Sequence, residues 1–475
     1  MTTSLPSSAT TSLPSDRPSA QGVDARGISA FLDALEARQD VEPHGLMILR
    51  HGSVVAEGWW APRQPDRISL LYSLSKTFTS TALGFAVDEG LLSMDDLVID
   101  HFPEFADEVP GRSRTIRIRH LAAMASGHTA EQDAIAVETD PAEPVRGFLL
   151  HEPEEEPGTW FQYNQPCTYT IAAIIQRKAG TTLVEYLRPR VLDPIGIGPV
   201  AWQEYPAGRN IGYSGLHATT DAVARLGLLH LQDGVWEGRQ VLPAGWAAEV
   251  RQKRVDNPRE PAVDWRQGYG YQVWMSRHGY RGDGAFGQFC LILPEQDAVV
   301  AFNSAELDMQ AVLDMVWEHL LPAFGGPAAS EAEEDALAER LAALALPAPE
   351  RTGRAPADRD GDYGPASFGV EAPAPTALRL DGDTLRVEDG TGSFVVPVGR
   401  AGWTTVDDDE TAPPVAVASG WAGDELQVDL LFLETPHRVA LALRPDRTFT
   451  ARWEPTAPLG PTMPLSTLRA PRPLG

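Results

Sequence analysis

Residues 70–86 read Leu-Leu-Tyr-Ser-Leu-Ser-Lys-Thr-Phe-Thr-Ser-Thr-Ala-Leu-Gly-Phe-Ala, and this segment sets the interpretation of the whole chain. Positions i and i+3 of a helix share a face, so a helix that begins here brings the Lys76 amine to the Ser73 hydroxyl. A serine needs such a base to become a nucleophile near neutral pH. Small and apolar residues follow, so we expect a buried helix, and burial lowers the pKa of a lysine toward a usable value. The alternative interpretation is an ordinary buried helix with a serine cap.

Four further segments follow in the chain and carry a resemblance to a known family. They are residues 117–128 (RIRHLAAMASGH), 157–165 (PGTWFQYNQ), 214–225 (SGLHATTDAVAR) and 284–295 (GAFGQFCLILPE). In content and order, the five segments resemble landmarks of the serine β-lactamase and penicillin-binding-protein superfamily, near the class C β-lactamases and related esterases. The resemblance covers residues 27–325.

The resemblance implies the fold of residues 27–325. It implies an α/β fold class, a β-lactamase-like α/β sandwich with an inserted helical lobe, formed by one serine hydrolase domain. Local patterns agree, because strand patterns at residues 46–59 and 286–302 enclose helical patterns such as 168–178. Residues 1–26 are rich in Ser, Thr and Pro at their start, and we expect a mobile N-terminal tail.

Composition changes after Phe324. Residues 326–358 combine an alanine-rich charged stretch with a Pro-rich stretch, which predicts a helical and Pro-rich linker. In residues 359–475 apolar side chains alternate with period two between turn signals, which predicts an antiparallel sheet or a small β-barrel. This part resembles the lipocalin-like C-terminal domains of some serine hydrolases in the family. We find no site chemistry in it and expect a structural or access-shaping role rather than ligand binding.

Charge and composition exclude several classes of partner. The net charge of −27 argues against binding to nucleic acid or to anionic lipid. No apolar window of about 18 residues is present, so we expect no membrane span. The N-terminus lacks the basic and apolar regions of a secretory signal, and the two cysteines are too few for a disulfide framework. We therefore expect a cytoplasmic protein, and the family resemblance implies a small-molecule substrate.

Tyr163 is the second candidate catalytic residue. The resemblance implies that this tyrosine points at the nucleophile as a phenolate or as a proton relay with Lys76. A phenol serves as a base only if its pKa falls, which a neighbouring Lys76 ammonium would cause. The family pattern Tyr-x-Asn is here Tyr163-Asn164-Gln165, so the third position keeps an amide that is one methylene longer. We expect Asn164 and Gln165 to bind substrate.

This sequence differs most from the family at the third motif, which is Lys-Thr-Gly on an edge strand. Its equivalent here is Gly282-Asp283-Gly284, which lacks the lysine that helps relatives to bind a substrate carboxylate. Asp283 would repel such an anion, and Arg281 is close enough in sequence to compensate in part. We expect Gly282, Gly284 and Arg281 to line the substrate site.

The resemblance also implies a two-donor oxyanion hole. The backbone N–H groups of Ser73 and Ala285 would bind the developing negative charge, and Gly284 would let the backbone approach the substrate closely. Among the sequence patterns we find no metal-ligand spacing and no phosphate-binding loop, so we expect no metal and no cofactor.

Three functions compete at this point. The first is a serine hydrolase that forms an acyl-enzyme on a neutral ester or amide. The second is a β-lactamase or D-Ala-directed peptidase, which the missing lysine and missing signal peptide disfavour. The third is a catalytically idle binding or scaffold protein, which has no need of Ser73, Lys76 and Tyr163 together. The sequence names neither the natural substrate nor the oligomeric state.

Overall fold

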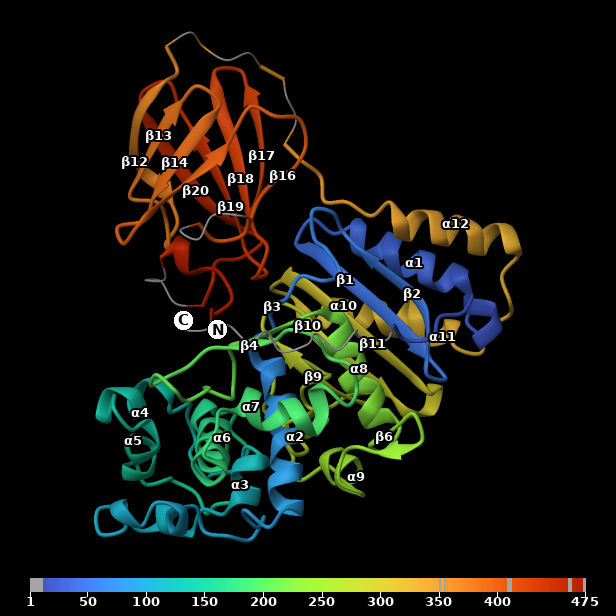
Figure 1. Ribbon diagram of the computed structural model, residues 1–475, viewed down its shortest axis with the longest axis vertical. Coiled ribbons are helices and arrows are strands. Elements are labelled where there is room, and N and C mark those ends of the chain that lie inside the picture. The colour runs from blue at the N-terminus through green and yellow to red at the C-terminus, as the bar shows by residue number, and fades with distance from the viewer. Residues whose placement is uncertain are drawn as a thin grey trace, which may run out of the picture.

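The computed structural model describes residues 12–349, 352–353, 356, 358–407, 412–459 and 464–472. A six-stranded sheet carries helices on both faces, a helical lobe lies beside it, and a nine-stranded sheet lies at the C-terminal end (Figure 1). The predicted fold class, an α/β sandwich with an inserted helical lobe followed by an all-β domain, is confirmed. The first eleven residues of the predicted tail and five residues of the predicted linker lie outside the described residues.

The six-stranded sheet is antiparallel and has the order β2-β1-β11-β10-β9-β8. Strands β1 and β11 are neighbours although about 250 residues separate them in the chain. The helical lobe is therefore an insertion between strands of one sheet. The strands are β1 (Val41–Arg50), β2 (Ser53–Trp59), β8 (Trp274–Met275), β9 (Tyr280–Gly284), β10 (Gln288–Leu293) and β11 (Ala298–Glu306).

Alternate residues of β1 enter two different cores. Leu46 and Ile48 pack with one set of helices, whereas Met47 and Leu49 pack with the other set and with the helical lobe. This is the pattern expected of a strand buried on both faces, since successive side chains point to opposite sides of a sheet. The first set is α1 (Ala25–Glu36), α10 (Met309–Met315), the π-helical turn η8 (Val316–Leu320), α11 (Leu321–Ala323) and α12 (Glu331–Ala342); the second is α2 (Ser75–Asp88) and α8 (Thr220–Leu231).

The helical lobe and several short elements complete the first part of the chain. The lobe contains α3 (Ile118–Ala122), α4 (Asp133–Thr139), α5 (Pro144–Leu150), α6 (Gln165–Ala179), α7 (Leu183–Leu187) and the π-helical turn η6 (Arg188–Leu192). The short elements are α9 (Trp246–Val250), β3 (Ser69–Leu70), β4 (Ala201–Trp202), β5 (Leu216–Ala218), β6 (Val235–Trp236), β7 (Arg239–Gln240) and the 3-10 turns η1 (Pro18–Gln21), η2 (Tyr72–Leu74), η3 (Val98–His101), η4 (Pro103–Phe105), η5 (Arg112–Thr115), η7 (Pro294–Gln296) and η9 (Leu465–Thr467). Among the described helices, none combines the length and the apolar character needed to cross a bilayer.

Residues 12–26 are packed onto the sheet, so the predicted mobile tail is wrong for this part. The Val54 N–H donates to the Pro14 carbonyl (2.8 Å), and the Asp16 N–H donates to the Val54 carbonyl (3.0 Å). Val23 is only 1% exposed and lies in the core beside α1. The segment covers the edge strand β2, which would otherwise present unpaired backbone groups.

Most of the predicted linker also belongs to the first part of the chain. Leu337, Leu344 and Leu346 are buried against the six-stranded sheet, and residues 344–346 exchange two backbone hydrogen bonds with Ala61. Charged and alanine-rich composition predicted the helix α12 correctly. It gave little sign of this packing, because Leu337 and Leu341 are the only large apolar side chains of the helix.

The C-terminal sheet curls toward a barrel, with the strand order β15-β14-β13-β12-β20-β19-β18-β17-β16 (Figure 1). Its strands are antiparallel except for β12 and β20, which pair in parallel and correct the prediction of a wholly antiparallel barrel. The strands are β12 (Gly361–Val370), β13 (Ala377–Asp381), β14 (Thr384–Glu388), β15 (Ser393–Pro397), β16 (Thr404–Val406), β17 (Val415–Ala422), β18 (Glu425–Phe432), β19 (Arg438–Leu443) and β20 (Thr448–Glu454).

A buried arginine fastens the two sheets together. The guanidinium of Arg63 donates from Nη1 to the carbonyls of Phe432, Leu433 and Thr435 at 2.9–3.0 Å. Leu433 also joins the core between α1 and the six-stranded sheet. The C-terminal sheet therefore shares hydrogen bonds and apolar core with the first part of the chain.

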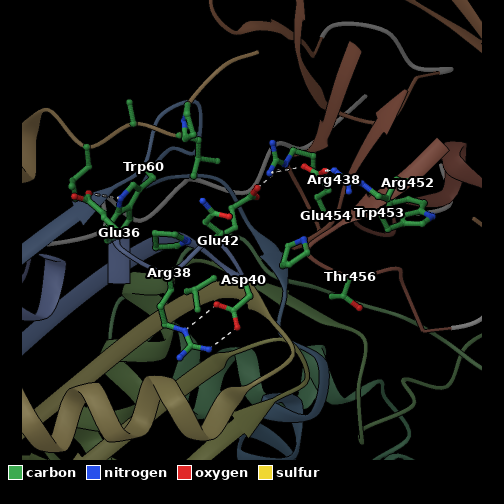
Figure 2. A pocket seen from close by; sticks show the side chains of 18 of the residues that line it. Glu36, Arg38, Asp40, Glu42, Trp60, Arg438, Arg452, Trp453, Glu454 and Thr456 are labelled. Carbon is green, nitrogen blue, oxygen red and sulfur yellow. Dashed lines mark hydrogen bonds and ion pairs between the residues drawn. The ribbon is translucent and has the colours of Figure 1, made fainter. Parts of the chain in front are cut away.

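A cavity of about 1,220 Å³ lies beside this contact (Figure 2). Its wall carries an ion-pair network in which Arg438 contacts Glu42 (2.7 Å) and Glu454 (3.4 Å), one from each sheet. None of the predicted site residues lines it. This cavity is thus a feature of the contact between the sheets.

The turn between β9 and β10 rests on a buried carboxyl group. Glu306 is 1% exposed, and a Cβ added at Gly287 in the turn would lie 2.0 Å from its Oε1. Burial raises the pKa of Glu306 to about 8, against smaller lowering effects of the Ser304 hydroxyl and of Arg38. Glu306 is therefore largely protonated at neutral pH.

We predict that Glu306→Gln stabilises the protein more at pH 8 than at pH 5. In the unfolded chain this carboxyl ionises near 4.5, so between that pH and 8 the folded state holds a proton that the unfolded state has lost. The contribution of this carboxyl to the free energy of unfolding therefore falls as pH rises. The amide of the Gln variant does not ionise, so the variant avoids this loss. Urea unfolding at the two pH values measures it, with the exposed Glu295→Gln as a control that should shift neither midpoint. An equal effect of Glu306→Gln at both pH values would contradict the prediction.

Candidate active site

Ser73 and Lys76 lie where an extended segment turns into helix α2. Ser73 sits in the 3-10 turn η2, one turn before the helix, and Lys76 follows in the first turn of α2. The Lys76 Nζ lies 3.0 Å from the Ser73 Oγ and donates to the Tyr213 carbonyl at 2.8 Å. The predicted i, i+3 relation thus brings the amine and the hydroxyl into hydrogen-bond contact.

The Lys76 amine is almost completely removed from water. The side chain is 1% exposed, and desolvation lowers its pKa to about 7, while nearby Asp283, Glu131 and Asp133 raise it to a smaller extent. A lysine with this pKa is partly neutral near pH 7, and a neutral amine beside a hydroxyl can accept its proton.

Tyr163 joins this pair through its ring and its hydroxyl. The Lys76 Nζ lies 4.7 Å from the ring centroid, and the ring stacks on Trp274 with centroids 5.2 Å apart. Burial raises the pKa of Tyr163, Asp283 raises it further, and a hydrogen bond with Ser73 lowers it in part. The Tyr163 hydroxyl therefore favours its protonated form, which argues against the expected phenolate. The proton relay with Lys76 stays a prediction.

Asn164 and Gln165 begin helix α6 directly after Tyr163. Asn164 is fully buried, and its Oδ1 accepts from the Gln132 N–H at 3.1 Å while its Nδ2 has no hydrogen-bond partner. The Gln165 N–H donates to Glu131 at 3.0 Å, and its buried Oε1 has no partner. Gln165 thus holds a buried acceptor without a partner, so its predicted role in binding substrate stays a prediction, whereas Asn164 mainly supports the loop before α4.

Two glycines let strand β9 approach the turn that carries Ser73, which we call the nucleophile turn (residues 71–74). A Cβ added at Gly284 would lie 2.1 Å from the Leu71 carbonyl oxygen, and one at Gly282 would lie 2.2 Å from the Thr77 Oγ1. Gly284 therefore fits its predicted role of close approach. Gly282 faces helix α2, so its predicted place in the substrate site is wrong, and any side chain at this position would have to displace the side chains of Thr77 and Leu74.

Arg281 is also wrong as a substrate-binding residue. Its side chain is fully buried, lies 4.2 Å from the Trp265 ring centroid, and donates from Nε to Asp283 at 2.9 Å. A guanidinium that is enclosed and paired in this way cannot reach a ligand carboxylate.

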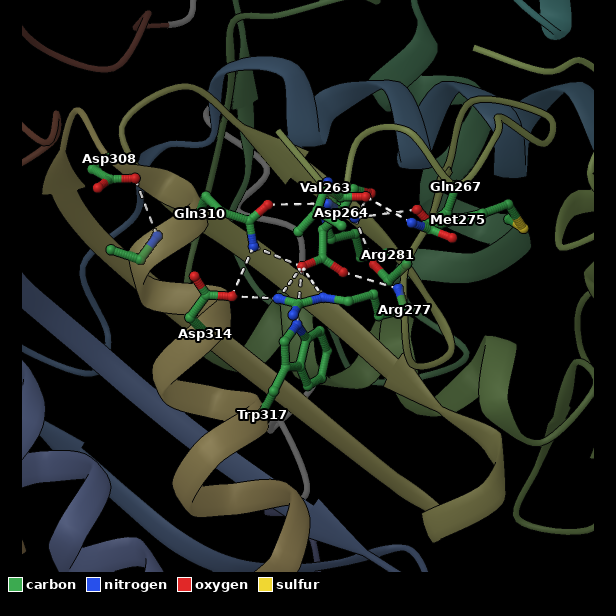
Figure 3. Close-up of polar contacts among 12 residues, drawn as sticks. Val263, Asp264, Gln267, Met275, Arg277, Arg281, Asp308, Gln310, Asp314 and Trp317 are labelled. Carbon is green, nitrogen blue, oxygen red and sulfur yellow. Dashed lines mark hydrogen bonds and ion pairs between the residues drawn. The ribbon is translucent and has the colours of Figure 1, made fainter. Parts of the chain in front are cut away.

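Figure 3 shows the polar network that holds Arg281 in place. Arg281 Nη1 donates to the Asp264 carbonyl at 3.0 Å. The Asp264 carboxylate accepts from Arg277, Gln310 and Trp317 at 2.7–3.0 Å. The strand that carries Asp283 is thus tied to helix α10 and the π-helical turn after it.

The proposed oxyanion donors are flanked by residues of unusual backbone conformation. Tyr72, just before Ser73, has φ of 48°, and Phe286, just after Ala285, has φ of 65°. Bulky residues rarely adopt positive φ, and such strain persists where the surrounding packing enforces it. The rings of Tyr72 and Phe286 contact each other edge to face with centroids 5.1 Å apart.

Tyr213 is a site residue that sequence analysis missed. Its carbonyl accepts a hydrogen bond from Lys76, and its ring centroid lies 5.7 Å from that amine. Its hydroxyl is hydrogen-bonded to Asp133. It precedes residues 214–225, which gave the only signal of its importance. Tyr213 also lines a cavity of about 430 Å³, together with Asp133, Ala136, Val137, Pro144, Pro166, Tyr169, Gln203, Glu204, Tyr205, Ile211 and Pro471.

Comparisons with known proteins agree with the geometry. A sequence model of the Beta-lactamase family matches residues 28–323. The 6-aminohexanoate-dimer hydrolase of Paenarthrobacter ureafaciens is 26% identical over 302 residues, which cover 57% of this chain and 76% of that protein. The lovastatin esterase of Penicillium rubens is 26% identical over 309 residues, covering 59% and 65%. The octameric penicillin-binding protein homologue of Pyrococcus abyssi matches in fold, with a TM-score of 0.51, 15% identity and coverage of 88% and 97%.

We predict that Gly284→Ala slows the reaction of Ser73 with a fluorophosphonate probe by about 10²-fold, the scale of losing one oxyanion donor. The added methyl group would displace β9, and with it Ala285, from the nucleophile turn. Mass spectrometry of the adduct over time measures the rate. Gly364→Ala, where the methyl group meets nothing within 4 Å, is the matched control. An unchanged rate in Gly284→Ala would show that the close approach is not required.

Proposed function

The chain belongs to the beta-lactamase family of serine hydrolases, and we propose that it hydrolyses neutral esters or amides through an acyl-enzyme on Ser73. The observation that carries the proposal is the contact of 3.0 Å between the Ser73 hydroxyl and a desolvated Lys76 amine. The relatives named above include a 6-aminohexanoate-dimer hydrolase and a lovastatin esterase, which supports this class of chemistry.

Acylation begins with proton transfer from Ser73 to Lys76. The neutral amine takes the hydroxyl proton while the serine oxygen attacks the substrate carbonyl carbon. The carbonyl oxygen becomes an oxyanion, which the N–H groups of Ser73 and Ala285 stabilise. The Tyr213 carbonyl holds the amine in line with the serine and stabilises the ammonium that forms.

The tetrahedral intermediate collapses when the leaving group receives a proton. The protonated phenol of Tyr163, hydrogen-bonded to Ser73, passes a proton to the leaving oxygen or nitrogen and regains one from the Lys76 ammonium. Water then attacks the carbonyl carbon of the acyl-enzyme, and Lys76 accepts a proton from this water. Lys76 returns the proton to the Ser73 oxygen as the acyl group leaves.

The charges around the site favour a substrate without a carboxylate near the scissile bond. Asp283, Glu131 and Asp133 all act on Lys76 as negative neighbours. Arg281, the nearest cation on β9, is enclosed and paired with Asp283. An anionic substrate would therefore meet net repulsion.

The cavity beside Tyr213 is a suitable place for the apolar part of a substrate. Its volume of about 430 Å³ matches a small organic group, and aromatic and proline side chains form much of its wall. We assign to it the acyl or leaving group that extends from the carbonyl held at Ser73.

We predict that a neutral short-chain p-nitrophenyl ester is turned over with higher kcat/KM than a chromogenic cephalosporin. Strand β9 has no lysine that could pair with a bound anion. Loss of such a charged partner commonly costs about 2–5 kcal/mol of binding free energy. Ser73→Ala should lose the turnover and the probe adduct. An adduct on Ser75, or a cephalosporin preference in the wild-type protein, would overturn the assignment of nucleophile or of substrate class.

We also predict that kcat/KM rises with pH and levels off above an apparent pKa of about 7, the value to which burial lowers Lys76. The protonated amine cannot accept the serine proton, so activity is lost as pH falls below this value. A neutral ester assayed between pH 5 and 9 measures the profile. Asp283→Asn removes a negative neighbour that favours the ammonium, so it should move the profile to lower pH. A profile that stays in place would exclude Lys76 as the base.

A further inference from the structure

The hairpin turn between β18 and β19 is buried, although hairpin turns usually lie in solvent. Leu433, Thr435 and His437 are 3%, 2% and 0% exposed. The Leu70 N–H, from strand β3 directly before the nucleophile turn, donates to the Glu434 carbonyl at 2.9 Å. The turn is thus seated against the segment that leads into Ser73.

His437 makes specific contacts with both residues that flank the oxyanion donors. The Tyr72 hydroxyl lies 2.5 Å from the His437 Nε2. The imidazole also meets the Tyr72 ring at 5.8 Å and the Phe286 ring at 5.2 Å, both edge to face. Burial lowers the pKa of His437 to about 3, so the ring is neutral and its Nε2 accepts a hydrogen bond from the Tyr72 hydroxyl.

These contacts fall on the two strained positions described above. Tyr72 and Phe286 hold positive φ values, and each is the chain neighbour of one proposed donor, Ser73 or Ala285. A backbone held in a sparsely populated conformation relaxes when the packing that enforces it is removed. Relaxation at either position would turn the adjacent N–H away from the oxyanion.

We propose that the C-terminal β domain holds the oxyanion hole in shape, with His437 as a positioning residue that fixes Tyr72 and Phe286. The inference rests on the proposed function, since it needs Ser73 as nucleophile. It gives the β domain a defined role in the reaction of the first domain. Arg63 supports the same arrangement, because it binds three carbonyls of the turn that presents His437.

Tyr72→Phe and His437→Phe test the proposal, since each keeps an aromatic ring and removes one side of the hydrogen bond. We expect each to lower kcat on a neutral ester about tenfold or more, less than the 10²–10³ typical of losing a donor outright. KM should change less than about threefold, because the oxyanion hole binds the transition state much more strongly than the carbonyl of the bound substrate. The double variant should be no slower than the slower single variant, because both remove one interaction.

Two measurements separate positioning from loss of folding. Active-site titration by the fluorophosphonate probe gives the competent fraction, and kcat is expressed per titrated site. A boronic acid, which forms a tetrahedral adduct on the serine, should lose affinity by the same factor as kcat. Tyr363→Phe is the matched control: this buried hydroxyl of the same domain donates to the Arg359 carbonyl at 2.6 Å, and its loss should leave kcat unchanged.

The outcomes are distinct for the two proposals. Unchanged kcat and boronate affinity in both single variants, or a loss explained entirely by the titrated fraction, would overturn the role of His437. If Ser73→Ala keeps full turnover in the same assay, the proposed function fails instead.

Discussion

The enclosure of one amine is the constraint on which the site depends. Lys76 is held between the Ser73 hydroxyl and the Tyr213 carbonyl, and burial lowers its pKa to about 7. Each surrounding element serves this enclosure. Helix α2 is buried along most of its length, Tyr163 covers the amine with its ring, and two glycines let β9 pack closely against the start of the helix. An exposed lysine at the same spacing would stay protonated and could not act as a base.

The chemistry of β9 distinguishes this chain from relatives with a lysine on that strand. A lysine beside Tyr163 would favour its phenolate, whereas Asp283 favours its protonated phenol. In the proposed mechanism the proton-accepting role therefore falls to Lys76, and the phenol donates. The same difference in charge removes an anchor for carboxylates, so under this proposal β9 determines both the protonation state of Tyr163 and the preference for uncharged substrates.

Local sequence was sufficient for the elements and for the core of the site. The spacing of Ser73 and Lys76 fixes their contact within one helical turn, and alternation in residues 46–59 predicts strands that the structure contains. Local sequence did not predict the roles of side chains that depend on tertiary packing. Arg281 looked available because it neighbours the third motif, but its side chain turns into the interior. Nothing near His437 in sequence indicates Tyr72, which lies 365 positions away.

The pairing of β1 with β11 has a consequence for synthesis of the chain. The β1–β2 hairpin emerges early with one edge unpaired, and its partner strand follows about 250 residues later. At roughly 5–20 residues per second, a ribosome exposes that edge for tens of seconds. The edge contains the apolar run Leu46–Leu49, so the nascent chain carries a surface of the kind that chaperones bind and that aggregation exploits. Yield of the folded enzyme should therefore depend on translation speed and on chaperone supply more than on the final stability of the sheet.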